Sequence, residues 1–167
     1  MTDLQEREVE IEGTAAVEAI LKEFAEQTQL GELTLDGANQ VVLMIDDFPV
    51  VLRLIEEPVA LLMITVRIAD MEPTDTATAN ALLELGFTTW MRGLMTLCLS
   101  EDGRSVEGFA PLPVSVLSLE VLSDSVGLMV DAAGALRAEL TDGALRYAGV
   151  SRSDPGPTVS ADPISFV

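Results

Sequence analysis

The residues that could perform chemistry in this chain are carboxylates and a single cysteine, because the 167-residue sequence contains no histidine. Without histidine, the Ser-His-Asp and Cys-His catalytic arrangements and most zinc sites are excluded. The adjacent acidic pairs, Asp46-Asp47 and Glu56-Glu57, fall at predicted turns, where acidic side chains are normally solvated. Cys98 lies in the apolar run LMTLCLS without a basic neighbour, so we expect a buried, structural thiol.

Motifs that hold cofactors are also missing from the sequence. No glycine-rich phosphate loop precedes a helix, and no Cys-x-x-Cys pair occurs. A metal site or a glycosidase would need carboxylates that converge from separate elements. We therefore expect a protein that is not an enzyme, with no catalytic residue, cofactor or metal. A small carboxylate-based, metal-binding enzyme remains the alternative from another functional class.

The composition combines strong acidity with a large apolar fraction. The chain carries 28 Asp+Glu against nine Lys+Arg, a formal net charge of -19, yet 49% of its residues are hydrophobic. An acidic chain this apolar is expected to fold, and its length suits one domain. The scattered basic residues argue against nucleic acid or a membrane surface as partner. The acidic field would attract a basic or apolar polypeptide, unless acidity serves solubility alone.

Three features predict a cytoplasmic location. A lone cysteine forms no internal disulfide, and the N-terminus MTDLQEREVEIEG lacks the basic and apolar segments of a signal peptide. Charged residues interrupt the richest apolar region well before it reaches the roughly 18–20 residues that span a bilayer.

Hydrophobic periodicity predicts eight elements between an acidic, loose leader at residues 1–13 and a flexible tail at residues 142–167. The domain between them, residues 14–141, has the order α-β-β-β-α-β-β-α. Short acidic turns make the first three strands an antiparallel meander, and Asp102-Gly103 marks a second hairpin. The fold class is therefore α+β. Thr14 is the expected N-cap of the first helix. The predicted elements are helix 14–29, strands 40–45, 49–55 and 60–68, helix 76–85, strands 93–100 and 105–112, and helix 115–141.

Two of the predicted strands carry apolar side chains on both faces. In the third strand, Leu62 and Ile64 share one parity, which we assign to the core, whereas the other parity is half apolar. Either a helix covers this second face, or it binds an extended polypeptide through its mixed surface. A one-residue slip in register would exchange the two faces. The predicted partner-binding residues are Val51, Arg53, Leu61, Met63, Thr65 and Arg67.

A second apolar excess lies in the second predicted helix and the strand that follows it, and it includes the only tryptophan of the chain. Aromatic residues and methionine are enriched in interface cores, and a two-fold dimer is the commonest use of such a patch. The alternative is an internal core with Trp90 packed inside one subunit. The predicted dimer residues are Leu82, Leu83, Leu85, Phe87, Trp90, Met91, Leu94 and Met95.

The element order, the pI near 4.1 and the local sequence texture resemble the class I type III secretion chaperones, the Tir-chaperone-like (CesT) family. The resemblance spans residues 14–141. It is carried by the helix end LKEFAEQTQL, the strand pair VVLMIDDFPVVLRL, the helix segment ALLELGF and the hairpin MTLCLSEDGRSVEGFAPLP.

The resemblance implies a cytoplasmic homodimer that binds the N-terminal segment of an effector in extended form. The chaperone would keep this segment secretion-competent for the export apparatus and its ATPase. It also implies that the second helix and adjacent strand form the dimer seam. The first helix and first sheet would supply apolar grooves for effector side chains. Val51, Leu61 and Met63 would line these grooves, with Arg53 and Arg67 at their rim.

Two further functions are compatible with the same fold. One is a regulatory or protein-binding module outside secretion. The other is a purely structural dimerisation module, which would predict a polar outer sheet face.

Overall fold

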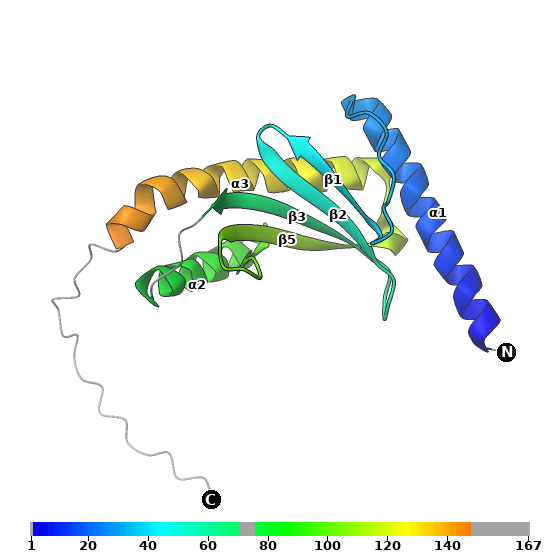
Figure 1. Cartoon of the computed structure of the whole chain (residues 1–167), viewed down its shortest axis with the longest axis horizontal. Helices are drawn as coiled ribbons and strands as arrows, with labels where there is room; N and C mark the ends of the chain where they lie inside the picture. The colour runs from blue at the N-terminus through cyan, green and yellow to red at the C-terminus, as the bar shows by residue number, and fades with distance from the viewer. Residues whose placement is uncertain (1, 71–75, 148–167) are drawn as a thin grey trace, which may run out of the picture.

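The computed structural model describes the backbone of residues 2–70 and 76–147, and the side chains of residues 13–70, 80 and 82–140. The predicted order α-β-β-β-α-β-β-α and the α+β class are confirmed (Figure 1). The elements are α1 (Thr2–Thr28), β1 (Gln40–Ile45), β2 (Phe48–Ile55), β3 (Leu61–Asp70), α2 (Thr76–Met91), β4 (Thr96–Leu99), β5 (Ser105–Pro113), the 3-10 turn η1 (Val114–Val116) and α3 (Leu119–Tyr147).

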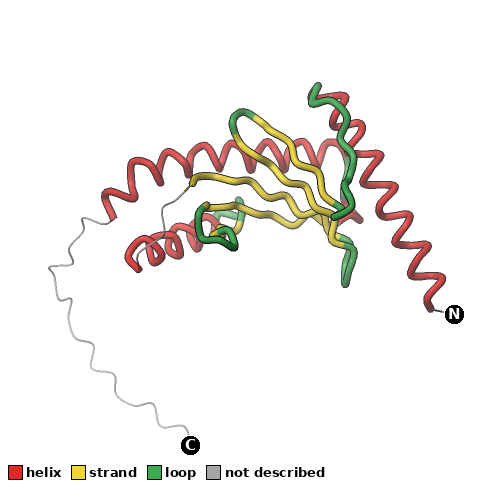
Figure 2. The backbone as a smooth tube through the Cα atoms, in the orientation of Figure 1, coloured by secondary structure: helices red, strands yellow, loops and turns green. Residues whose placement is uncertain are grey.

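The strands form one five-stranded antiparallel sheet in the order β1-β2-β3-β5-β4 (Figure 2). The predicted meander is present, and the second hairpin extends it because β5 pairs with β3. Asp46 and Asp47 form the two-residue turn between β1 and β2, with φ angles of 48° and 50°. Positive φ at both central residues is the type I′ geometry that matches the twist of a hairpin.

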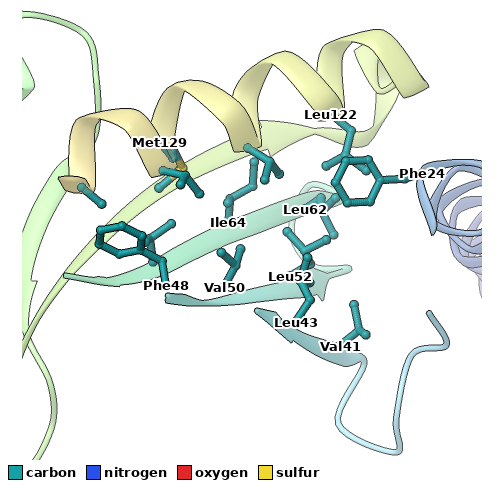
Figure 3. Packing of buried hydrophobic residues seen from close by; sticks show 14 of the residues in the cluster. Phe24, Val41, Leu43, Phe48, Val50, Leu52, Leu62, Ile64, Leu122 and Met129 are labelled. Atoms are coloured by element: carbon teal, nitrogen blue, oxygen red, sulfur yellow. The ribbon is translucent and has the colours of Figure 1, made fainter. Parts of the chain in front are cut away.

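One face of the sheet carries the hydrophobic core. Leu52, Leu62 and Ile64 are fully buried, and in Figure 3 they lie beneath Leu122 and Met129 of α3. Burying a large aliphatic side chain contributes about 1.5–3 kcal/mol, so these alternating strand residues fix which face the helix covers.

Helix α1 is longer than the sequence predicts. It begins at Thr2, so residues 2–13, expected as a loose leader, are helical. Thr14 therefore lies inside the helix and is not its N-cap. Its hydroxyl donates a 2.9 Å hydrogen bond to the Glu56 carboxylate at the end of β2, which ties the helix to the sheet. The helix buries Val17, Leu21 and Phe24 in the core.

Helix α2 also runs past its predicted end at Gly86. Its stop is Gly93, which has a φ of +68° and donates its backbone N–H to the Trp90 carbonyl at 2.8 Å. A glycine in the left-handed region is the usual helix terminator, whereas Gly86 has ordinary helical geometry. The extra turns carry the aromatic residues of this region.

Helix α3 begins at Leu119, later than predicted, and extends to Tyr147, beyond the predicted end at residue 141. Arg137 joins it to the sheet: the Nε atom donates a 2.6 Å hydrogen bond to the Ile68 carbonyl. The same guanidinium lies 3.7 Å above the centre of the Phe48 ring, within the range of a cation–π contact. The predicted loop at residues 71–75 and the tail from residue 148 lie outside the described residues.

Candidate polypeptide-binding surfaces

The face of the sheet opposite the core is open. Strand alternation places Val51 and Arg53 of β2 on it, and their Cα partners on β3 are Thr65 and Met63. Val42, the Cα partner of Val51 on β1, is 61% exposed. Exposure this large shows that none of the described elements covers the sheet at β1. We call this surface the open face: Val42, Met44, Val51, Arg53, Leu61, Met63, Thr65, Arg67 and Phe109.

The open face contains all six residues predicted to bind a partner. The register Val51↔Thr65 and Arg53↔Met63 matches the predicted parity, and the slip that would exchange the faces does not occur. The alternative of a covering helix does not hold for the described part of the chain. Binding by these residues stays a prediction.

Sequence reasoning missed three members of the open face. Val42 and Met44 stand on alternating positions of the run QVVLMI, so the parity argument applied to the third strand would have found them. Phe109 pairs with Thr65 only because β5 joins β3, and no local pattern reveals that pairing.

The two cations of the open face have different partners. Arg67 forms a 2.7 Å ion pair with Asp70. Arg53 donates from Nε and Nη2 to the neutral side-chain oxygen of Gln40, at 3.2 and 2.6 Å. Arg53 therefore keeps a full positive charge that no described carboxylate neutralises by direct contact.

Helix α2 presents a second apolar surface. Its exposed residues recur at the spacing of one helical face, and Leu83 is 73% exposed. The rings of Phe87 and Trp90 are 6.2 Å apart. Trp90 is 58% exposed, so the alternative that it packs inside one subunit is wrong. We call this surface the α2 face: Leu83, Phe87, Trp90 and Met91.

The other residues predicted for the dimer seam lie elsewhere. Met95 is only 4% exposed and belongs to the core, where its side chain lies over Gly108 of β5. Leu82, Leu85 and Leu94 are partly buried and pack against the same core. The apolar residues of this region therefore divide into two groups, one in the interior and one on the α2 face. Within α2, the two groups lie on different sides of the helix because of its 3.6-residue period.

With this geometry, the sequence model of the Tir chaperone protein (CesT) family matches residues 19–137, which is most of the chain. The chain belongs to that family. The family is one of type III secretion chaperones, which act by binding and not by catalysis. The match covers the whole sheet, α2, residues 19–28 of α1 and most of α3, so both surfaces described above lie within the family domain.

Solved structures share the fold of this Tir chaperone family member at low sequence identity. The ExsC-ExsE complex aligns with a TM-score of 0.67 and 22% identity, over 75% of this chain and 93% of that chain. The HopA1-SchA chaperone-effector complex aligns with a TM-score of 0.62 and 17% identity, over 75% and 95%. The Yersinia pestis type III secretion chaperone SycH, in complex with a stable fragment of YscM2, gives 0.52 and 21%, over 69% and 94%. A comparison with curated protein sequences gives no significant match.

Cys98 does not occupy the buried position that the sequence predicts. It is exposed on β4, which is an edge strand, and its Cα partner is Glu107 on the open side of the sheet. Partial burial, and after it the charge of Glu107, raise the pKa of the Cys98 thiol. The thiol is therefore a weaker nucleophile than its exposure alone would suggest.

The described residues contain no group of three or more Cys, Asp or Glu side chains placed to hold a metal ion. Within the same part of the chain, no helix is both long and apolar enough to cross a membrane.

Proposed function

We propose that this chaperone binds the N-terminal segment of an effector polypeptide in extended form on the open face, and catalyses nothing. It acts in the cytoplasm as a homodimer joined through the α2 face. The bound segment stays unfolded and secretion-competent until it reaches the export apparatus and its ATPase. Family membership and the chaperone-effector complexes among the similar folds support this proposal.

The observation that carries the proposal is the apolar surface of the open face. Val42 and Met44 expose more than half of their area on the same side of β1, and the partly exposed Met63 extends this surface across the sheet. Exposed apolar side chains that adjoin one another over several strands are typical of interaction sites. Arg and Met on such a surface suit a partner that makes both apolar and polar contacts.

Binding of this kind needs no chemical step. Apolar anchors of the effector contribute about 25 cal/mol per Å² that they bury, less the entropic cost of ordering the segment. One anchor is weak, but several anchors spaced along an extended chain add up without requiring the effector to fold. A dimer would offer two open faces to one effector chain, so the second contact benefits from a high effective concentration.

The α2 face supports the dimer in the proposal. Four large apolar side chains on one helical face exceed the scattered exposure that is normal for a monomer. Two copies of the helix related by a two-fold axis would cover each other's aromatic rings, since a self-complementary patch closes such a dimer.

The test replaces an open-face anchor by a charge. Met63→Asp, or Leu61→Asp, is expected to abolish copurification with the effector and to leave the dimer mass unchanged in light scattering, because α2 is untouched. Val59→Asp is the control, since Val59 is also apolar and, at 61% exposed, more accessible, but lies in the loop before β3. A Met63→Asp protein that retains its effector at full yield would remove the open face from the proposal.

A further inference from the structure

The open face differs in charge from the rest of the molecule. The chain has a net charge of -19, yet strand alternation places Arg53, Arg67 and Glu107 on this side of the sheet. The Asp70 carboxylate reaches the same side, where it pairs with Arg67. A segment that lies beside Arg53 therefore meets a positive charge inside a negative field.

Arg53 is the cation available to that segment. Arg67 is neutralised by Asp70 at 2.7 Å, and its Cα partner on β5 is Glu107. Arg53 instead contacts the uncharged Gln40, and Met63 is its Cα partner on β3. A guanidinium has five N–H donors in a planar fork, which suits a carboxylate better than an amide oxygen.

Asp36 does not already satisfy Arg53. Its Oδ1 atom accepts the backbone N–H groups of Ala38 and Gln40, at 2.8 and 3.1 Å. These local contacts close the loop before β1. The backbone N–H of Ala38 and, more weakly, the charge of Arg53 lower the pKa of Asp36, but Asp36 and Arg53 form no ion pair. A guest carboxylate would meet no competing acid in direct contact with the guanidinium.

The residues on either side of Arg53 on β2 determine which guest residues fit beside such a carboxylate. Val51 and Ile55 stand two positions to either side of it on β2, on the same face. In an extended guest, side chains that face the sheet also recur every second residue, about 6.6 Å apart. A guest running along β2 would therefore place its acid on Arg53 and apolar residues over Val51 and Ile55.

We propose that the open face recognises an extended effector segment of the pattern apolar-x-acid-x-apolar, with the guest Asp or Glu held by Arg53. This proposal rests on the proposed function and reverses the expectation from composition, which favours a basic partner. The acidic surroundings would repel most acidic chains, so only a segment that buries its apolar residues and places its acid on Arg53 gains from the contact.

The test uses labelled peptides with the centre Leu-Thr-Leu-Thr-Xaa-Thr-Leu-Thr-Leu between Gly-Ser ends, where Xaa is Asp, Asn or Lys. Their affinity for the full chain is measured by fluorescence anisotropy at about 0.5 M salt, where the general field is screened within a few ångströms. We expect the Asp peptide to bind about fivefold more tightly than the Asn peptide. Arg53→Gln should remove this preference, and Arg53→Glu should transfer it to the Lys peptide.

Arg67→Gln is the matched control and should keep the preference for Asp, because Arg67 is already paired. Equal affinity for the Asp and Asn peptides, or a preference that survives Arg53→Gln, would overturn the charge assignment. If all three peptides bind equally and Met63→Asp abolishes binding, the proposed function stands and only this inference fails. If Met63→Asp changes nothing, the open face itself is wrong.

Two other occupants are distinguished by the same assay. A peptide of residues 148–167 that displaces the labelled probe would identify the chain's own terminal segment as the ligand. A probe affinity that falls as the protein associates, with the association lost in Arg53→Gln, would identify a second copy. Either result would overturn the assignment to an effector segment.

Discussion

The open face and the α2 face are both apolar and exposed, but they are built differently. On the sheet, Arg53, Thr65 and Arg67 interrupt the apolar side chains. On α2, Phe87 and Trp90 stand side by side, and no charged residue separates them. A mixed surface stays soluble when it is empty, whereas a continuous aromatic surface favours a permanent partner. In the proposed function, this contrast corresponds to an effector that is released from the sheet and a dimer partner that stays on the helix.

The largest effect is expected when a charged residue is placed on the α2 face. Trp90→Asp should raise the dissociation constant of the proposed dimer about a thousandfold, because two unpaired carboxylates would be buried at one symmetric interface. Light scattering should then give a mass near 17.8 kDa, in place of twice that value for the wild type. Leu128→Asp, on the exposed side of α3, is the control and should leave the mass unchanged. A Trp90→Asp protein that keeps the dimer mass would contradict the assignment.

The second test compares the two faces of β2. Leu52→Ala should lower the free energy of unfolding by about 3 kcal/mol, because it opens a cavity in the core. Val51→Ala, one residue earlier and on the open face, should cost less than about 1 kcal/mol while weakening effector binding. Urea denaturation measures both values. Similar losses of stability would mean that the open face is packed against something within the chain.

The third test asks whether the stability of the fold can be lowered without affecting either surface. Arg137→Met should lower the free energy of unfolding by about 1–2 kcal/mol, because the Ile68 carbonyl loses its donor and Phe48 loses the guanidinium. Effector binding and dimer mass should not change in this variant. Arg104→Met, at an exposed hairpin position, is the control and should leave stability within about 0.5 kcal/mol. A binding defect in Arg137→Met would show that the two sides of the sheet are coupled.

The smallest expected effect concerns Cys98. Its raised pKa leaves less thiolate at a given pH, so iodoacetamide should alkylate it more slowly than an unstructured cysteine, with a rate that rises as the pH rises. Glu107→Gln removes one cause of the raised pKa and should speed the reaction by about threefold or less. A bound effector should slow the reaction further, because Cys98 shares the side of the sheet that carries the open face. An effector that leaves the rate unchanged would place the ligand away from β4.

The period-two and helical patterns were sufficient to predict the element order, the sheet faces and most of the apolar surfaces. Val51 and Met63 could be assigned because one parity of each strand is uniformly apolar, which leaves the other parity for the outside. The ends of helices were harder to predict. Gly86 and Thr14 carry ordinary end signals, but tertiary contacts to β4 and Glu56 override them.

Pairing between distant segments was not predictable from local sequence. Cys98 is surrounded by apolar residues and would be buried in a central strand, but β4 lies at the edge of the sheet. The contact of Arg53 with Gln40 depends on the register of β1 with β2, 13 residues apart. The same register gives the Arg53 guanidinium an uncharged partner, Gln40, and composition alone does not reveal this pairing.

The bond between Arg137 and Ile68 joins residues 69 positions apart in the chain. The core side of the meander is closed by Leu122 and Met129, which also come late in the sequence. During synthesis, strands β1 to β3 therefore leave the ribosome with apolar residues on both sides, and α3 covers one of these sides only after α2, β4 and β5 have also been made. The nascent chaperone is itself prone to aggregate until α3 is made, and in the proposed function an effector can bind the open face only after α3 has covered the other side of the sheet.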